Sequence, residues 1–225
     1  MAKLTQTLAA WYEHHVLPVG LDFVCGLGRF SEQRDKVVPQ ARGRILEIGI
    51  GTGLNLPHYD RSHVDSITGV DPATELHRWA QRRAREAGLQ VDLVPLQAES
   101  LPFTNDSFDT VLVTYALCTI EDPVAALQEM RRVLKPEGRL IYCEHGLAPE
   151  DAVQRWQRRI NPLWCRYAGG CQLDRDIPDL IRAAGFELVD PQSGYISGPR
   201  PFTYNYWGQA RALVAAAPST GPCHG

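Results

Sequence analysis

The sequence lacks several features that would direct its function toward particular classes of protein. With 23 basic and 26 acidic side chains, its formal net charge of −3 carries no excess of positive charge for a nucleic-acid partner. Its six cysteines form no C-x-x-C pair and show no spacing typical of zinc ligands. We therefore expect no nucleic-acid partner, no bound metal, and free thiols in a reducing cytosol.

The sequence also lacks a long apolar run and a recognisable secretory signal. Residues 16–27 are apolar, but Pro18, Gly20 and Asp22 interrupt the run, which is too short to span a bilayer. We expect a cytoplasmic monomer or homodimer without a transmembrane segment. Peripheral contact with a membrane stays open.

The most informative segment present is 44–55, with the sequence R-I-L-E-I-G-I-G-T-G-L-N. Its apolar half predicts a buried strand, after which Gly49, Gly51 and Gly53 let the backbone turn sharply and approach a ligand. Glu47 lies just before this turn, where an acid does not suit a pyrophosphate. The glycines also fall at every second position, unlike the G-x-G-x-x-G pattern of dinucleotide sites.

A second acidic residue follows the glycine turn at a spacing that indicates a ligand. Asp71 ends the run D-S-I-T-G-V-D and lies 20 residues after Gly51. An acid at the end of the second strand of such a unit accepts the hydroxyl groups of a ribose. The glycine turn and Asp71 together predict a nucleoside pocket without phosphates.

These residues resemble motif I and the acid after strand two of class I S-adenosylmethionine-dependent methyltransferases. The resemblance implies S-adenosylmethionine as the cofactor, with the three glycines beside its methionine part and Asp71 on its ribose. The segment 97–109 contains Q-A-E-S-L-P-F and S-F-D and resembles a further block of that class, which implies Ala98 and Glu99 near the adenine. The expected cofactor-binding residues are Glu47, Gly49, Gly51, Gly53, Asn55, Asp71, Pro72, Ala98, Glu99, Thr114 and Tyr115.

The alternation of apolar strands with amphipathic helices predicts an α/β fold with a doubly wound, Rossmann-like sheet and helices on both faces. We expect seven mostly parallel strands, the last one antiparallel, and a first helix that begins in 52–59. Residues 1–40 are expected to form an N-terminal helical lid with breaks at Pro18, Gly20, Gly26 and Gly28. The methyltransferase domain would span 41–212, followed by a disordered tail at 213–225.

Four further segments resemble the methyltransferase-like 7 proteins, which methylate alkyl thiols. They are Y-A-L-C-T-I at 115–120, E-H at 144–145, N-P-L-W at 161–164 and G-C-Q-L-D-R at 170–175. This resemblance implies a small hydrophobic acceptor, with a thiol favoured. Methylation at N, O or C of a phospholipid headgroup or a quinone stays open, and so does a non-catalytic module that binds S-adenosylmethionine.

The catalytic candidates follow from the chemistry of a thiol acceptor. A thiol has a pKa near 8.5, so only a few per cent is ionised at neutral pH and a base would help. His145 is our candidate for that base, although it and Glu144 could instead satisfy backbone groups or each other. Tyr115 and Cys118 are further candidates because they follow the fourth strand.

Two interpretations stay secondary. Cys118 and Cys171 are more typical of small buried apolar residues than of nucleophiles, and no clustered cysteine pair in the sequence supports a site for arsenic(III). Four aromatic residues could line an acceptor pocket, although such residues more often pack in a core. They are Trp156, Trp164, Tyr167 and Trp207.

Overall fold

The structure is a computed structural model, and it describes residue 12 and residues 16–213. The first 15 residues of the expected lid, apart from Tyr12, and almost all of the tail expected at 213–225 lie outside these residues. Within the described part of the chain, no helix is both long enough and apolar enough to cross a membrane.

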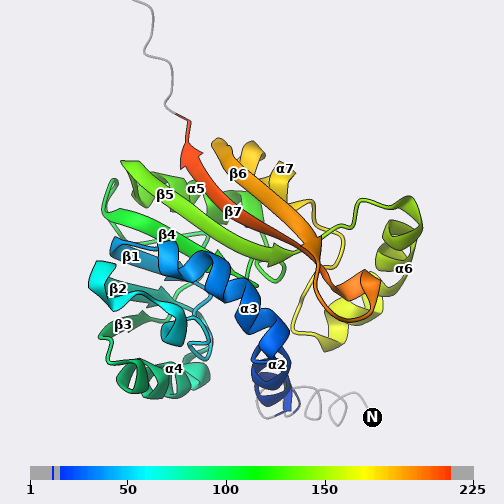
Figure 1. The fold of residues 1–225 in the computed structure, drawn as a ribbon, viewed down its shortest axis with the longest axis horizontal. Coiled ribbons are helices and arrows are strands. Elements are labelled where there is room, and N and C mark those ends of the chain that lie inside the picture. The colour runs from blue at the N-terminus through cyan, green and yellow to red at the C-terminus, as the bar shows by residue number, and fades with distance from the viewer. Residues whose placement is uncertain (1–11, 13–15, 214–225) are drawn as a thin grey trace, which may run out of the picture.

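A seven-stranded sheet forms the centre of the molecule, as Figure 1 shows. Its order is β3-β2-β1-β4-β5-β7-β6, and only β7 runs antiparallel to its neighbours β5 and β6. This confirms the doubly wound, mostly parallel sheet expected from the sequence. The strands are β1 (Gly43–Ile48), β2 (Val64–Val70), β3 (Val91–Val94), β4 (Phe108–Thr114), β5 (Leu134–His145), β6 (Phe186–Tyr195) and β7 (Tyr204–Ala212).

Helices cover both faces of this sheet. Because successive side chains of a strand point to opposite faces, Leu46 and Ile48 of β1 pack with α5 and α7, whereas Ile45 packs with α3 and α4. Figure 1 shows α3 in front of the sheet and α5 behind it. The helices are α2 (Leu17–Cys25), α3 (Gly28–Val37), α4 (Thr74–Ala87), α5 (Pro123–Val133), α6 (Asp151–Tyr167) and α7 (Ile177–Ala183).

The parallel strands place four chain segments at one edge of the sheet. Ile48 pairs with Val70 and with Val113, and Thr114 pairs with Cys143, so β1, β2, β4 and β5 end at the same level. The residues that follow these ends are the glycine turn and the segments that begin at 71, 115 and 144. Ligands of open α/β sheets bind at this edge.

The prediction that a helix begins within 52–59 is wrong. After β1 the chain makes successive turns and then only a short 3-10 helix, η3 (Leu56–His58). Gly51 and Gly53 adopt left-handed φ values of 51° and 81°, which an α-helix does not allow. The side chain of Asn55 is also committed to contacts described below, so this segment follows the site rather than helix propensity.

Two of the breaks expected near the N-terminus are also wrong. Pro18 lies in the first turn of α2, where its missing N–H costs nothing, and Gly20 lies within the helix. The chain changes direction only between Gly26 and Gly28, where α3 begins. In β6, a bulge between Val189 and Gln192 interrupts the pairing with β7, which then resumes.

An ion pair fastens α2 to the glycine turn. The guanidinium of Arg83 donates to both carboxylate oxygens of Asp22 at 2.8 and 3.1 Å and to the backbone oxygen of Thr52 at 2.8 Å. The Thr52 hydroxyl also donates to Asp22 at 2.5 Å. Arg83 lies on α4, and only 17% of its side chain is exposed. It serves as the tie between α4, the turn and α2.

We predict that Asp22→Asn loosens α2. The change leaves the Arg83 guanidinium without its carboxylate, which should lower the free energy of unfolding by about 1–3 kcal/mol and speed proteolysis within α2. Denaturant titration and limited proteolysis measure the two effects. The matched control is Asp179→Asn, because Asp179 pairs with Arg182 on an exposed helix face. Equal losses in the two variants would contradict an anchoring role for Asp22.

Candidate active site

A cavity of about 380 Å³ opens at the edge where the parallel strands end. Its volume falls within the range of roughly 300–1,000 Å³ that is usual for small-molecule sites. The segments that line it come from α2, the glycine turn, the ends of β2 and β4, and the loop after α6. Of the residues predicted from the sequence, the lining includes Gly49, Gly51, Asn55, Asp71, Thr114, Tyr115 and Cys118.

Asp71 has the geometry expected of a ribose acceptor. One carboxylate oxygen accepts the amide of Gly51 at 2.9 Å, and the other accepts the amide of Ala73 at 2.9 Å. Burial raises the pKa of Asp71, and these two amides oppose that shift. Each oxygen keeps a lone pair for a ligand hydroxyl. A Cβ atom on Gly51 would lie 3.8 Å from this carboxylate, so the glycine leaves the space beside it open. The residues present therefore fit the nucleoside of S-adenosylmethionine.

Glu47 supports the turn from behind and lies outside the lining of the cavity. Its side chain is 1% exposed, and its two oxygens accept the Asn55 amide at 2.9 Å and the Tyr59 hydroxyl at 2.7 Å. Asn55 also meets the Thr114 hydroxyl at 3.0 Å and accepts from Arg34 of α3 at 3.0 Å. One buried network thus joins β1, the glycine turn, β4 and α3.

Four other residues predicted to bind the cofactor also lie outside the lining, namely Gly53, Pro72, Ala98 and Glu99. Ala98 is 6% exposed and packs in the core, and the Glu99 carboxylate accepts the amide of Asp122 at 3.4 Å. Their contact with the adenine stays a prediction.

Tyr115 has a backbone conformation that a residue with a side chain rarely adopts, with φ of 52°. Such a conformation costs about 1–3 kcal/mol and is found mostly at functional sites. The ring packs edge to face on Phe30 with centroids 5.2 Å apart, and the hydroxyl donates to Asn205 at 2.8 Å. Burial raises the pKa of Tyr115 well above its usual value, so the hydroxyl remains neutral. A catalytic role for it stays a prediction.

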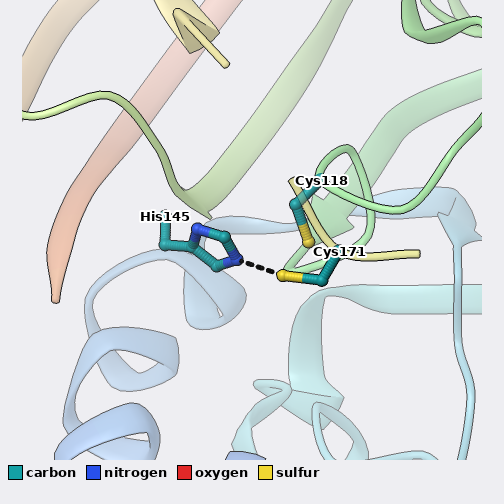
Figure 2. A group of neighbouring side chains, drawn as sticks. All are labelled: Cys118, His145 and Cys171. Atoms are coloured by element: carbon teal, nitrogen blue, oxygen red, sulfur yellow. Dashed lines mark hydrogen bonds between the residues drawn. The ribbon is translucent and has the colours of Figure 1, made fainter. Parts of the chain in front are cut away.

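Cys118, His145 and Cys171 meet beside the cavity, as Figure 2 shows. Their sulfur and ring nitrogen atoms lie within 4.8 Å of one another, and Nε2 of His145 is 3.0 Å from the sulfur of Cys171. Both cysteines are buried and line the cavity, whereas His145 lies behind Cys171 and outside the lining. The sequence holds no clustered cysteine pair, but the fold brings Cys118 and Cys171 together from distant parts of the chain.

Backbone contacts hold the loops that carry these side chains. The buried carboxylate of Glu144 accepts the amides of Ala116 and Leu117 at 2.8 and 3.1 Å, which fixes the loop before Cys118. Left-handed conformations at 169 and 170 turn the chain back after α6. The backbone N–H of Gln172 then donates to the backbone oxygen of Cys118 at 2.8 Å. The three residues are thus placed by the fold around them.

The surroundings of Cys171 favour a thiolate. The neighbouring Cys118 thiol is the main cause that lowers the pKa of Cys171, and burial opposes this shift. His145 and the indole N–H of Trp164, 3.1 Å from the sulfur, act in the same direction. Burial lowers the pKa of His145, but the charge of Cys171 outweighs this and raises it. A role for His145 as a base toward an acceptor stays a prediction.

Other lining residues had no signal in the sequence. Cys25 and Asp22 of α2, Arg34 of α3 and Ala168 reach the cavity only through the tertiary fold. The four aromatic residues considered for an acceptor pocket are absent from the lining. Trp156 and Tyr167 are 59% and 55% exposed on α6, Trp164 contacts Cys171, and Trp207 lies under Lys36.

Comparison with known proteins identifies the class. A family model described as a methyltransferase domain matches residues 46–142, which include the glycine turn, Asp71 and β4. The chain is 32% identical over 164 residues to the thiol S-methyltransferase TMT1B of Rattus norvegicus, which covers 71% of this chain and 66% of that protein. It is 35% identical over 127 residues to a phosphatidylethanolamine N-methyltransferase of Cereibacter sphaeroides, covering 52% and 62%.

Two further comparisons extend this result. The mitochondrial methyltransferase OMS1 of Saccharomyces cerevisiae is 28% identical over 188 residues, covering 74% of this chain. The chain spans between 39% and 66% of the length of these three relatives. A crystal structure titled the [4+2]-cyclase SpnF shares the fold, with a TM-score of 0.64, 23% identity and coverage of 83% of this chain and 82% of that one.

The match of the family model, together with these relatives and the site geometry, shows that the chain belongs to the class I S-adenosylmethionine-dependent methyltransferases. S-adenosylmethionine is the cofactor of that class. Within it, the chain is close to the thiol S-methyltransferases TMT1A and TMT1B.

We predict that Asp71→Ala weakens binding of the demethylated cofactor, S-adenosylhomocysteine, at least tenfold. The change removes a charged acceptor, and a hydrogen bond to a charged group is worth about 1.5–3 kcal/mol. Gly51→Val should have a similar effect, because it puts a β-branched side chain into the cavity at a left-handed φ. Isothermal calorimetry measures both. Gly28→Val, where nothing lies within 4 Å of the added Cβ, is the matched control. Unchanged affinity in Asp71→Ala would show that the ribose lies elsewhere.

We also predict that Glu47→Gln flattens the dependence of stability on pH. Burial is the main cause that raises the pKa of Glu47 to about 7, although Tyr59 and Asn55 oppose it. Because the folded state keeps this proton when the unfolded chain has lost it, Glu47 makes stability fall as pH rises from about 4.5 to 7. The variant should lose that part of the slope in denaturant titrations at pH 5 and 7.5. Tyr59→Phe removes a bond to the carboxylate and should steepen the slope. If the slope of stability against pH is unchanged in Glu47→Gln, another titratable group causes it.

Proposed function

We propose that the chain methylates the sulfur of a small hydrophobic thiol at the expense of S-adenosylmethionine. One observation carries this proposal: the same cavity is lined by the predicted nucleoside site and by apolar and sulfur-bearing side chains. These side chains include Leu17 and Leu21 of α2, Ala168 and the two cysteines, Cys118 and Cys171. The similarity to thiol S-methyltransferases supports the same acceptor.

The cofactor supplies a methyl group that its sulfonium has already activated. The contribution of this chain is then to orient the acceptor and exclude water, effects that can be worth about 7–11 kcal/mol. Asp71 and the glycine turn would hold the nucleoside, and α2, tied to the turn by Asp22, would cover the cavity. In this role the helices within 1–40 serve as a lid.

The acceptor must also lose its proton, because a thiol is a weaker nucleophile than its thiolate. A free thiol with a pKa near 8.5 is mostly protonated at neutral pH. His145 is the titratable side chain behind Cys171 and remains our candidate for a base.

The second candidate is methylation of the amine of a phospholipid headgroup. The similarity to a phosphatidylethanolamine N-methyltransferase favours it, as do apolar side chains exposed on α2. Phe23 and Val19 are 70% and 54% exposed there, as an enzyme at a lipid surface would require. Against it, Arg34 of the cavity is already bonded to Asn55 and to the backbone oxygen of Cys25, so it is not free to hold a phosphate.

An acceptor panel decides between the two. We predict that labelled S-adenosylmethionine transfers its methyl group to alkyl thiols, that kcat/KM rises with the length of the alkyl chain, and that the rate increases from pH 6.5 to 8.5 as the thiolate forms. Mass spectrometry of the products identifies the methylated atom.

Two outcomes would contradict thiol methylation. Transfer to phosphatidylethanolamine in vesicles, or to a quinol, with no transfer to any thiol would assign the other chemistry. Normal cofactor binding without turnover on any acceptor would favour a non-catalytic module. Asp71→Ala is the control, and it should lose turnover on every acceptor that the wild type methylates. A cytoplasmic location and a monomer or homodimer are part of the same proposal.

A further inference from the structure

Two thiols on the wall of the cavity meet an imidazole behind them, and none of the three belongs to the residues assigned above to the cofactor. Cys118, His145 and Cys171 each offer one ligand atom, and the three atoms lie within 4.8 Å of one another. We propose that they form a binding site for one Zn²⁺ ion, with the fourth coordination position open to the cavity. Both cysteines line that cavity.

The donor set and its spacing fit this ion. In a tetrahedral site with Zn–S of about 2.3 Å and Zn–N of about 2.0–2.1 Å, the ligand atoms lie roughly 3.3–3.8 Å apart. Here Nε2 of His145 is 3.0 Å from the sulfur of Cys171, and no pair exceeds 4.8 Å. Side-chain shifts of about 1 Å therefore produce the tetrahedral spacing.

The chemistry of the ligands excludes most other ions. Thiolates disfavour Mg²⁺ and Ca²⁺, which prefer oxygen, and an imidazole with two thiolates suits Zn²⁺. The two thiolate charges balance the charge of the ion, so it can lie in this buried setting without a net charge. The indole N–H of Trp164 donates to the sulfur of Cys171 at 3.1 Å, a contact of the kind that orients and tunes metal ligands.

The fold prepares the three positions without a metal. Glu144 holds the loop of Cys118 through two backbone amides and is followed directly by His145 at the end of β5. The amide of Gln172, next to Cys171, is bonded to the backbone of Cys118. Two loops and a strand end, drawn from three parts of the chain, are thus tied together around the proposed ion.

The open coordination position could bind the acceptor, and this step rests on the thiol acceptor proposed above. Three protein ligands with a fourth position left for water or substrate are typical of catalytic zinc sites. An acceptor thiol that binds there would release its S–H proton to water as its sulfur bonds to the ion. The bound sulfur would keep a lone pair, which would form the new bond to the methyl carbon as the sulfonium S–C bond breaks and S-adenosylhomocysteine leaves. The ion would then replace a general base.

Cadmium binding tests the site directly. The full chain, reduced and stripped with a chelator, is titrated with Cd²⁺ while the thiolate-to-cadmium absorption in the ultraviolet is followed. We expect one equivalent to bind and Zn²⁺ to displace it. Cys118→Ser, Cys171→Ser and His145→Ala should each weaken binding at least tenfold. Cys165→Ser is the matched control, because Cys165 lies on α6 and outside the cavity lining.

Several outcomes would overturn the proposal. These are no stoichiometric binding, binding that survives Cys171→Ser, or an equal loss in Cys165→Ser. Arsenite binding that needs the two cysteines but not His145, with no binding of Zn²⁺, would do so too. Far-ultraviolet circular dichroism checks that each variant folds. If one does not, alkylation of wild-type thiols is compared with and without Zn²⁺. Protection of residues 118 and 171 by the ion supports the site, and its absence overturns it.

Activity separates this proposal from the function it rests on. Chelation should lower methyl transfer to thiols at least tenfold, added Zn²⁺ should restore it, and affinity for S-adenosylhomocysteine should not change. Full activity in the chelated protein would overturn the role of the ion while leaving thiol methylation intact. Stoichiometric binding of Cd²⁺ and Zn²⁺ in a protein that methylates no thiol would keep the site and reject the thiol acceptor.

Discussion

The hydrogen bond between the buried carboxylate of Glu47 and the amide of Asn55 is the contact on which the rest of the site depends. It holds the turn after β1 in place, so that the amide of Gly51 reaches Asp71 on the neighbouring strand. The same Asn55 accepts from Arg34, which brings α3 against the turn. Removing a carboxylate from water is costly, and its two hydrogen bonds offset that cost. A buried acid thus defines a cavity that it does not line.

A second buried acid acts in a similar way two strands further along the sheet, on β5. The buried carboxylate of Glu144 holds the loop after β4 by its amides, as Glu47 holds the turn after β1. The left-handed backbone of Tyr115 lies between the two. Burial raises the pKa of both acids to about 7. Two buried carboxylates and a strained residue lower stability, and they gather where the ligand would bind, as expected when strain is kept for function.

The fold alone does not decide the chemistry. The [4+2]-cyclase SpnF shares this architecture. The similar proteins also include a thiol S-methyltransferase and a phosphatidylethanolamine N-methyltransferase, whose names give different acceptor atoms. The ends of the strands bring Asp71 and Thr114 to the cavity, whereas α2 and the loop after α6 bring Leu17, Leu21 and Cys171. Loops and added helices of this kind are where α/β proteins that share one sheet differ most.

The sequence by itself determined the alternating strands and helices, the turn at Gly49–Gly53 and the acid at Asp71, because each depends on local periodicity or on short spacing. It did not determine that 52–59 would avoid an α-helix, since the contact of Asn55 with Glu47 and Thr114 overrides local propensity there. Only the tertiary structure decided the meeting of Cys118, His145 and Cys171, because their proximity depends on strand order and on the loop after α6. Residues that meet in this way have no fixed spacing in the sequence, so no sequence pattern predicts their contact.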